Sequence, residues 1–180
     1  MAIAGCTLQS DSGAGSSAAT GQPLPFSGKD SMAYAAKLWR GMQQANLVGS
    51  NRIMSTPYTG QHPHGAILDT IDRPFTLDGH TGYLIIKRNY GGEGVSKQAV
   101  ANDPDKWLAA ITVMYRREAG YDPENRNWFW AKYLPDGHLA KNPQGMALAG
   151  RVAKGANQGC IACHQSAPGG DYVFNHDRYR

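Results

Sequence analysis

Two cysteines and a histidine near the C-terminus have a spacing that supports a specific chemistry. Cys160 and Cys163 are separated by two residues, and His164 follows directly. Two thiols about one helical turn apart can add to the two vinyl groups of a porphyrin, and the adjacent histidine then binds the iron as its proximal ligand. The motif predicts one covalently attached haem c held by these three residues.

A zinc half-site and a redox dithiol are the alternatives for this cysteine pair. Zinc would require more Cys or His ligands at suitable spacing, and the third cysteine, Cys6, lies far away in an N-terminal tail. A dithiol gives no role to His164. The motif therefore favours haem, and because haem c is attached outside the bacterial cytoplasm, we expect a periplasmic protein.

The position of the motif bears on the class of cytochrome. Small electron carriers have the motif near the N-terminus and a methionine ligand downstream, but no methionine follows His164. A sixth ligand from the chain would come from upstream, where Met54, Met114 and Met146 are candidates. A six-coordinate electron-transfer cytochrome c remains the alternative to a protein with an open distal haem face.

The elements that must position the motif are mostly strands. Apolar residues at helical spacing predict an N-terminal helix over 31–48, capped by Asp30 or Ser31 and ended by Gly49. We predict an α+β fold, mainly an antiparallel β-sheet or small barrel, with that N-terminal helix and a short C-terminal helix carrying the Cys-x-x-Cys-His motif. The expected strands are 66–71, 83–90, 110–117 and 127–134, and the expected motif helix is 157–165.

The first 25 residues are predicted to be a tether. Ile3-Ala4-Gly5-Cys6 is similar to a bacterial lipobox, with a chance four-residue match as the alternative. Residues 7–25 are rich in Ser, Gly, Ala and Thr, a composition typical of flexible linkers. We therefore expect lipidation of Cys6, membrane attachment through that anchor alone, and a folded haem domain over 26–180.

Composition argues against nucleic acid as a partner. The chain has 180 residues and a net charge of +4, from 18 basic and 14 acidic residues. The basic residues are scattered along the sequence, whereas a nucleic-acid-binding surface would cluster them.

Several segments together resemble the cytochrome P-460 family, which includes the β-type cytochromes c-prime. The resemblance covers roughly residues 30–176 and rests on these segments: His64-Gly65, "GYLIIKRNY", "ITVMYRREAGYDPENRNWFWAKYLPDG", "GCIACH" and "DYVF". It implies a five-coordinate haem iron with an open distal face that binds or oxidises nitric oxide or hydroxylamine. The implied partners are that small ligand and a redox partner cytochrome, and a homodimer is left open.

Lys87 falls where the P-460 branch of the family cross-links a lysine to the porphyrin. On a strand it would share one face with Tyr83, Ile85 and Asn89. The alternative is an edge-strand lysine whose stem covers apolar surface. The sequence leaves both interpretations of Lys87 open.

The resemblance places the distal pocket at Thr112 and Met114. Hydroxylamine-oxidising members carry a glutamate there as proton acceptor, and neither of these residues is an acid. Glu118 or Glu93 would reach the pocket only through a difference in loop length. We therefore expect weak hydroxylamine oxidation, because a missing base usually costs about 10²–10⁴-fold in rate.

Of three further groups of residues, two have both a structural and a functional interpretation. His62-Pro63-His64 could ligate the haem or another metal, but a pair of turn histidines is the simpler interpretation. Trp128 and Trp130 are expected in the core, with contact to the haem as the alternative. Residues 171–174 are expected to pack the C-terminus onto the proximal side of the haem.

Overall fold

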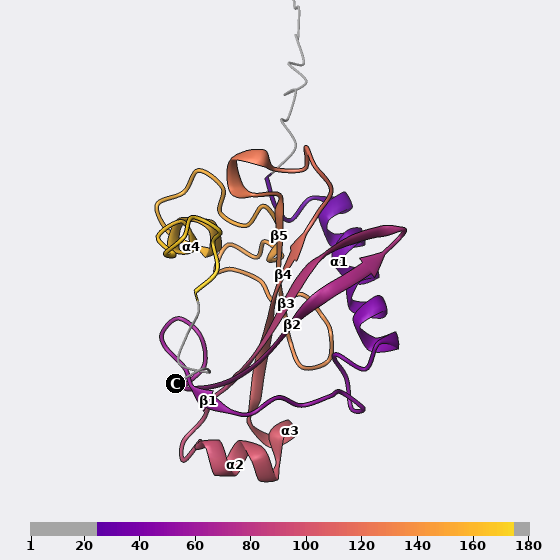
Figure 1. Ribbon diagram of the computed structural model, residues 1–180. Coiled ribbons are helices and arrows are strands. Elements are labelled where there is room, and N and C mark those ends of the chain that lie inside the picture. The colour runs from indigo at the N-terminus through magenta and orange to yellow at the C-terminus, as the bar shows by residue number, and fades with distance from the viewer. Residues whose placement is uncertain (1–24, 175–180) are drawn as a thin grey trace, which may run out of the picture.

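The computed structural model describes residues 25–174, and the fold there is the predicted α+β type. An open, six-stranded antiparallel sheet runs in chain order from β1 to β6, so of the two predicted β architectures the sheet is the one observed. Figure 1 shows α1 on one side of the sheet and α4 on the other. Cys6 and most of the predicted tether lie outside the described residues. The strands are β1 (Tyr58–Thr59), β2 (Ile67–Leu77), β3 (His80–Tyr90), β4 (Leu108–Arg116), β5 (Trp128–Tyr133) and β6 (Ala149–Gly150).

The N-terminal helix begins and ends earlier than predicted. Helix α1 spans Lys29–Gln44 with Gly28 as its N-cap, and Asp30 lies in its first turn, where a carboxylate interacts favourably with the helix dipole. Asn46 ends the helix by taking the left-handed conformation, with φ 54°. The backbone N–H groups of Asn46 and Leu47 donate to the carbonyls of Gln43 and Met42, which is a Schellman motif. The prediction that Gly49 ends the helix was wrong because asparagine also tolerates this conformation.

Strand β2 is longer than the predicted 66–71 because it continues through Pro74 to Leu77. Strand β1 pairs only with Ile67 and Leu68, so within the described chain the outer edge of β2 has no strand beside Pro74. Proline is tolerated at such an edge, where no N–H is needed. Asp78 and Gly79 then turn the chain into β3 with positive φ at both residues, as a tight hairpin requires.

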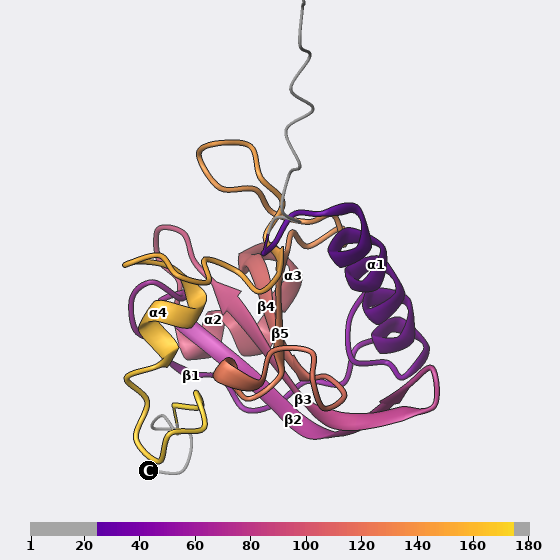
Figure 2. The ribbon, with the colours of Figure 1, turned by 90° about the horizontal axis from the view of Figure 1, so that it is seen from above.

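Alternating side chains give the sheet two different faces. One face packs against α1, whose buried residues Leu38, Trp39 and Met42 join the strand residues in a hydrophobic core. The opposite face forms a smaller apolar cluster with residues of the C-terminal region. Figure 2 shows the resulting layers, with α1, the sheet and α4 in that order. The buried strand residues of this core are Leu77, Leu84, Ile86, Ile111, Val113, Tyr115, Phe129, Ala131, Tyr133 and Ala149.

The motif helix α4, Cys160–His164, is shorter than the predicted 157–165. It begins after Gly159, whose φ is 116° and at which a Cβ would lie 2.4 Å from the Cβ of Ala153. Two small helices, α2 (Lys97–Asn102) and α3 (Pro104–Trp107), and a 3₁₀ turn, η1 (Pro123–Asn125), were not predicted. No helix within residues 25–174 has the length and apolar character needed to cross a bilayer.

Candidate functional site

A cavity of about 290 Å³ lies between α4 and the sheet face opposite α1. Strands β2 to β5 supply one wall, and α4 with the segment that follows it supplies the other. The cavity brings together His164, Cys160 and the three strand residues named from the sequence. Its lining residues are Tyr58, His64, Thr70, Asp72, Tyr83, Ile85, Lys87, Thr112, Val113, Met114, Trp130, Ala131, Cys160, His164, Val173 and Phe174.

His164 makes the hydrogen bond that is usual for a metal-binding histidine. The residue is 8% exposed, and Nδ1 lies 2.6 Å from the backbone carbonyl oxygen of Tyr172. A carbonyl only accepts, so Nδ1–H is the donor and Nε2 carries the lone pair. This hydrogen bond fixes the ring orientation and raises the basicity of Nε2 as a ligand.

The segment after the motif is anchored so that the Tyr172 carbonyl stays in place. Trp128 Nε1 donates to the carbonyl of Asp171 at 3.0 Å, and the Asp171 carboxylate pairs with Arg116 at 2.5 Å. The Tyr172 hydroxyl contacts Asn125 Oδ1 at 3.1 Å. The C-terminal segment is therefore packed on the His164 side, and it orients the histidine through Tyr172.

The environment of Trp130 indicates whether the cavity suits a haem. Its ring centroid is 4.8 Å from that of His164, and its buried Nε1 has no hydrogen-bond partner among the residues that the structure describes. A buried N–H without an acceptor is costly unless a bound group supplies one. The surrounding Ile85, Met114 and Phe174 give apolar walls suited to a macrocycle, and the propionates of a haem are acceptors. The residues present fit the group.

The two motif cysteines have different environments. Cys160 lines the cavity, and burial raises the pKa of its thiol to about 11. Cys163 lies one helical turn further along α4 and is exposed. Both thiols are unbridged, as attachment to a porphyrin requires.

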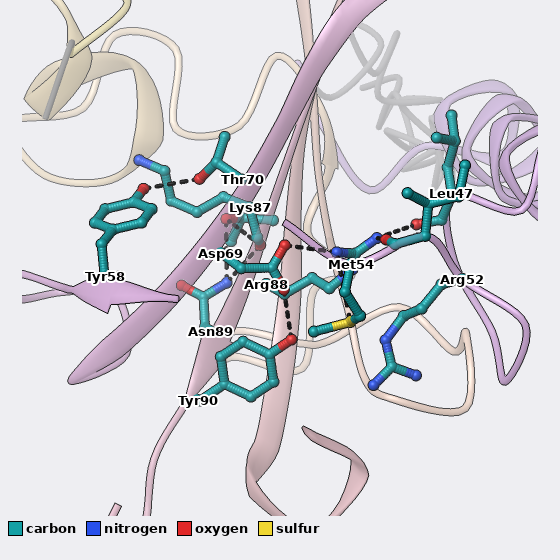
Figure 3. Close-up of polar contacts among 12 residues, drawn as sticks. Leu47, Arg52, Met54, Tyr58, Asp69, Thr70, Lys87, Arg88, Asn89 and Tyr90 are labelled. Atoms are coloured by element: carbon teal, nitrogen blue, oxygen red, sulfur yellow. Dashed lines mark hydrogen bonds and ion pairs between the residues drawn. The ribbon is translucent and has the colours of Figure 1, made fainter. Parts of the chain in front are cut away.

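The distal candidates lie together on neighbouring strands. Lys87 of β3 is directly opposite Thr112 of β4, and Met114 is opposite both Ile85 and Trp130. All three candidates line the cavity. In Figure 3, Lys87 and Arg88 extend to opposite sides of β3, which puts the lysine on the cavity side. Their locations agree with the predicted pocket, and their roles stay predictions.

Other sequence candidates lie away from the cavity. Met54 contacts Arg88 on the other side of β3, and Met146 is not among the lining residues described. Glu118 is paired with Arg117, which lowers the pKa of its carboxyl, and Glu93 is exposed; neither lines the cavity. Trp128 is fully buried and forms no part of the lining, so of the two tryptophans only Trp130 reaches the site.

Asp72 is a functional candidate that sequence reasoning missed. It is the one carboxylate among the described lining residues, and it accepts a short hydrogen bond from the Tyr83 hydroxyl. Asp72 was overlooked because the predicted strand stopped at residue 71. Its place two residues after Thr70 on the same strand face was the available signal.

Comparison with known proteins identifies the family. The family model for cytochrome P460 matches residues 78–175, which is more than half of the chain and includes β3, β4, β5 and the complete haem motif. No curated protein and no solved structure matches the chain. The match agrees with the site geometry around His164. The chain therefore belongs to the cytochrome P460 family and is a haem protein.

Proposed function

We propose that the protein is a periplasmic monohaem c-type cytochrome that binds nitric oxide or hydroxylamine in the cavity between α4 and the sheet. The observation that carries this proposal is His164, buried on the motif helix, facing the cavity and oriented by the Tyr172 carbonyl. Cys160 and Cys163 would hold the haem covalently, and His164 would be its proximal ligand. When bound, the haem supplies an iron that can coordinate and oxidise small nitrogen species.

The protein's own side chains exclude water and handle protons. Ile85, Met114 and Phe174 form apolar walls that favour a small, weakly polar ligand such as nitric oxide. Hydroxylamine oxidation also needs a proton acceptor, and Asp72 provides a carboxylate in the wall where Thr112 provides none. Asp72 is thus the proposed base for any oxidation, and nitric oxide capture requires no such group.

Cofactor attachment and ligand binding are tested with protein matured in a bacterial periplasm. Intact mass should show one retained haem in the wild type and in a Cys6→Ser control, and no retained haem in the Cys160→Ser/Cys163→Ser variant. Addition of nitric oxide should change the absorbance spectrum of the ferrous protein. A mass equal to that of the apoprotein would contradict the proposal. So would an absorbance spectrum that nitric oxide does not change, both in the wild type and in a variant that lacks any side chain bound to the distal side of the iron.

The remaining assignments are proposals about location and partners. The lipobox-like Ile3–Cys6 supports an acylated Cys6 as the membrane anchor, and a redox partner cytochrome would accept electrons in the periplasm. Labelling with a fatty-acid analogue in the wild type and in Cys6→Ser tests the anchor, because only the former should incorporate label.

A further inference from the structure

His64 lines the cavity but has no part in the proposed function. It precedes the matched residues 78–175, and it lies in the turn between β1 and β2. Its ring centroid is 6.3 Å from that of His164, and the two rings are nearly perpendicular at 85°. Both histidines line the same cavity.

The hydrogen bonds of Asn89 assign the tautomer of His64. Asn89 Nδ2 donates to the backbone carbonyls of Lys87 at 2.8 Å and Ala110 at 3.2 Å, which fixes the orientation of the amide. Asn89 Oδ1 is therefore the acceptor for His64 Nδ1, 3.0 Å away. His64 Nδ1–H donates, and Nε2 carries the lone pair, as in His164.

The distance between the rings discriminates between two roles for His64. A ring nitrogen lies about 1.15 Å from the centre of an imidazole, and an imidazole nitrogen lies about 2.0–2.1 Å from a bound metal. Two imidazoles on opposite sides of one metal therefore have centres about 6.4 Å apart, which agrees with the observed 6.3 Å. A histidine hydrogen-bonded to a small ligand on the iron would need roughly 8–9 Å.

An edge-to-face ring contact is also compatible with 6.3 Å. Such a contact would not require both histidines to have their Nδ1 atoms tied to acceptors. That shared arrangement is typical of metal ligands, and it favours ligation over ring packing alone.

The loop that carries His64 is held close to the sheet by glycines. A Cβ at Gly65 would lie 2.5 Å from the Tyr90 carbonyl oxygen and 2.6 Å from the Tyr90 nitrogen. A Cβ at Gly60 would lie 1.9 Å from the Gly65 carbonyl oxygen. Side chains at either position would push the loop away, so the glycines permit the close approach that brings His64 to the cavity.

We propose that His64 Nε2 is the second axial ligand of the haem iron in the resting protein, and that nitric oxide or hydroxylamine binds by displacing it. This inference rests on the proposed haem site and describes its regulation. The ligand-free iron is then six-coordinate, and the His64 loop controls access to it. The apparent affinity for an added ligand is reduced by the fraction of molecules in which His64 has left the iron.

Absorbance and electron paramagnetic resonance spectra of the ferric holoprotein test the proposal. The wild type should be low-spin, and His64→Ala should be high-spin. His62→Ala, which removes an exposed histidine from the same loop, should remain low-spin. Added imidazole should return His64→Ala to the low-spin state, and Gly65→Ala should show a smaller low-spin fraction than the wild type.

Ligand binding gives an independent readout. If His64 occupies the iron in nine-tenths of the molecules or more, its removal should tighten apparent nitric oxide binding at least about tenfold. A high-spin wild type with haem attached would overturn this inference and leave the proposed function standing. A low-spin His64→Ala without imidazole would also overturn it, because another residue would then be the ligand. If both proteins are low-spin and their spectra do not change with nitric oxide, the proposed function is refuted as well.

Discussion

Replacing Asp69 with asparagine should destabilise the protein strongly without touching the haem cavity. Asp69 and Arg88 are both 0% exposed and form an ion pair at 2.6 Å across β2 and β3. Arg88 also donates to the carbonyls of Leu47 and Ile53, and the Tyr90 hydroxyl donates to Asp69. Figure 3 shows this network on the side of β3 away from Lys87. Asp69→Asn leaves a buried guanidinium without its counter-charge.

The expected loss follows from that burial. Removal of one partner from a buried ion pair costs about 3–5 kcal/mol of the free energy of unfolding. For a domain of this size, each kcal/mol corresponds to roughly 2–4 °C in Tm, so the Tm should fall by roughly 6–20 °C. Asparagine keeps an acceptor oxygen, which places the expected loss toward the lower end of both ranges.

Urea denaturation of the holoprotein, followed by far-ultraviolet circular dichroism, measures this loss. Asp78→Asn is the matched control, because Asp78 pairs with Lys37 at 2.5 Å with both side chains about half exposed. Exposed pairs contribute about 0–1 kcal/mol, and asparagine suits the turn conformation of residue 78. Equal losses in the two variants would refute the reasoning that burial makes the Asp69–Arg88 pair important.

Three further predictions concern the cavity and the tyrosines. Lys87→Ala should abolish the strongly red-shifted ferrous Soret band expected of a lysine–porphyrin cross-link, while the haem stays attached. A spectrum identical to that of the wild type would place the protein in the branch of the family without the cross-link. Asp72→Asn should slow hydroxylamine oxidation by about 10²–10⁴-fold and leave nitric oxide binding unchanged, and equal rates in stopped-flow assays would exclude Asp72 as the base. Burial raises the pKa of Tyr121 to about 12 and raises the pKa of Tyr90 and Tyr133 further. Tyrosines in the unfolded chain have a pKa near 10, so the free energy of unfolding should fall as the pH rises from about 10 to 12 and beyond. Ultraviolet absorbance should show these buried phenols ionising at a higher pH than exposed tyrosines. Ionisation of all nine tyrosines near pH 10 in the folded protein would contradict this.

The haem motif and the strong strands were readable from the sequence because each depends on local signals. The predicted strands 83–90 and 127–134 agree closely with β3 and β5, since β-branched and aromatic residues lie between clear turn residues. The order Cys-x-x-Cys-His likewise indicates its chemistry without any structure. The α+β class followed from these segments and was confirmed.

The features that the sequence did not reveal depend on contacts between distant residues. Strand β2 continues past residue 71 through Pro74, and only the short pairing of β1 shows that Pro74 lies on an edge of the sheet. Asp72 enters the cavity as a result of that extension. For His64, the sequence suggested a turn, but the separation from His164 spans a hundred residues of chain and is set by the packing of the loop against Tyr90.

Successive side chains of β3 point alternately to the cavity and to the α1-side core, so substitutions along the strand affect either ligand binding or the stability of the sheet. Ile85, Lys87 and Asn89 belong to the cavity or support it, while the intervening Ile86 and Arg88 are buried on the α1 side. A shift of the strand by one residue would exchange these sets and place Arg88 in the cavity and Lys87 in the Asp69 network. An insertion within β3 would therefore disturb the cavity and the α1-side core together, whereas a substitution at Lys87 would change the cavity lining and leave the buried residues of the other face in place. Ligand preference can thus change through Lys87 while the core that maintains the sheet remains intact.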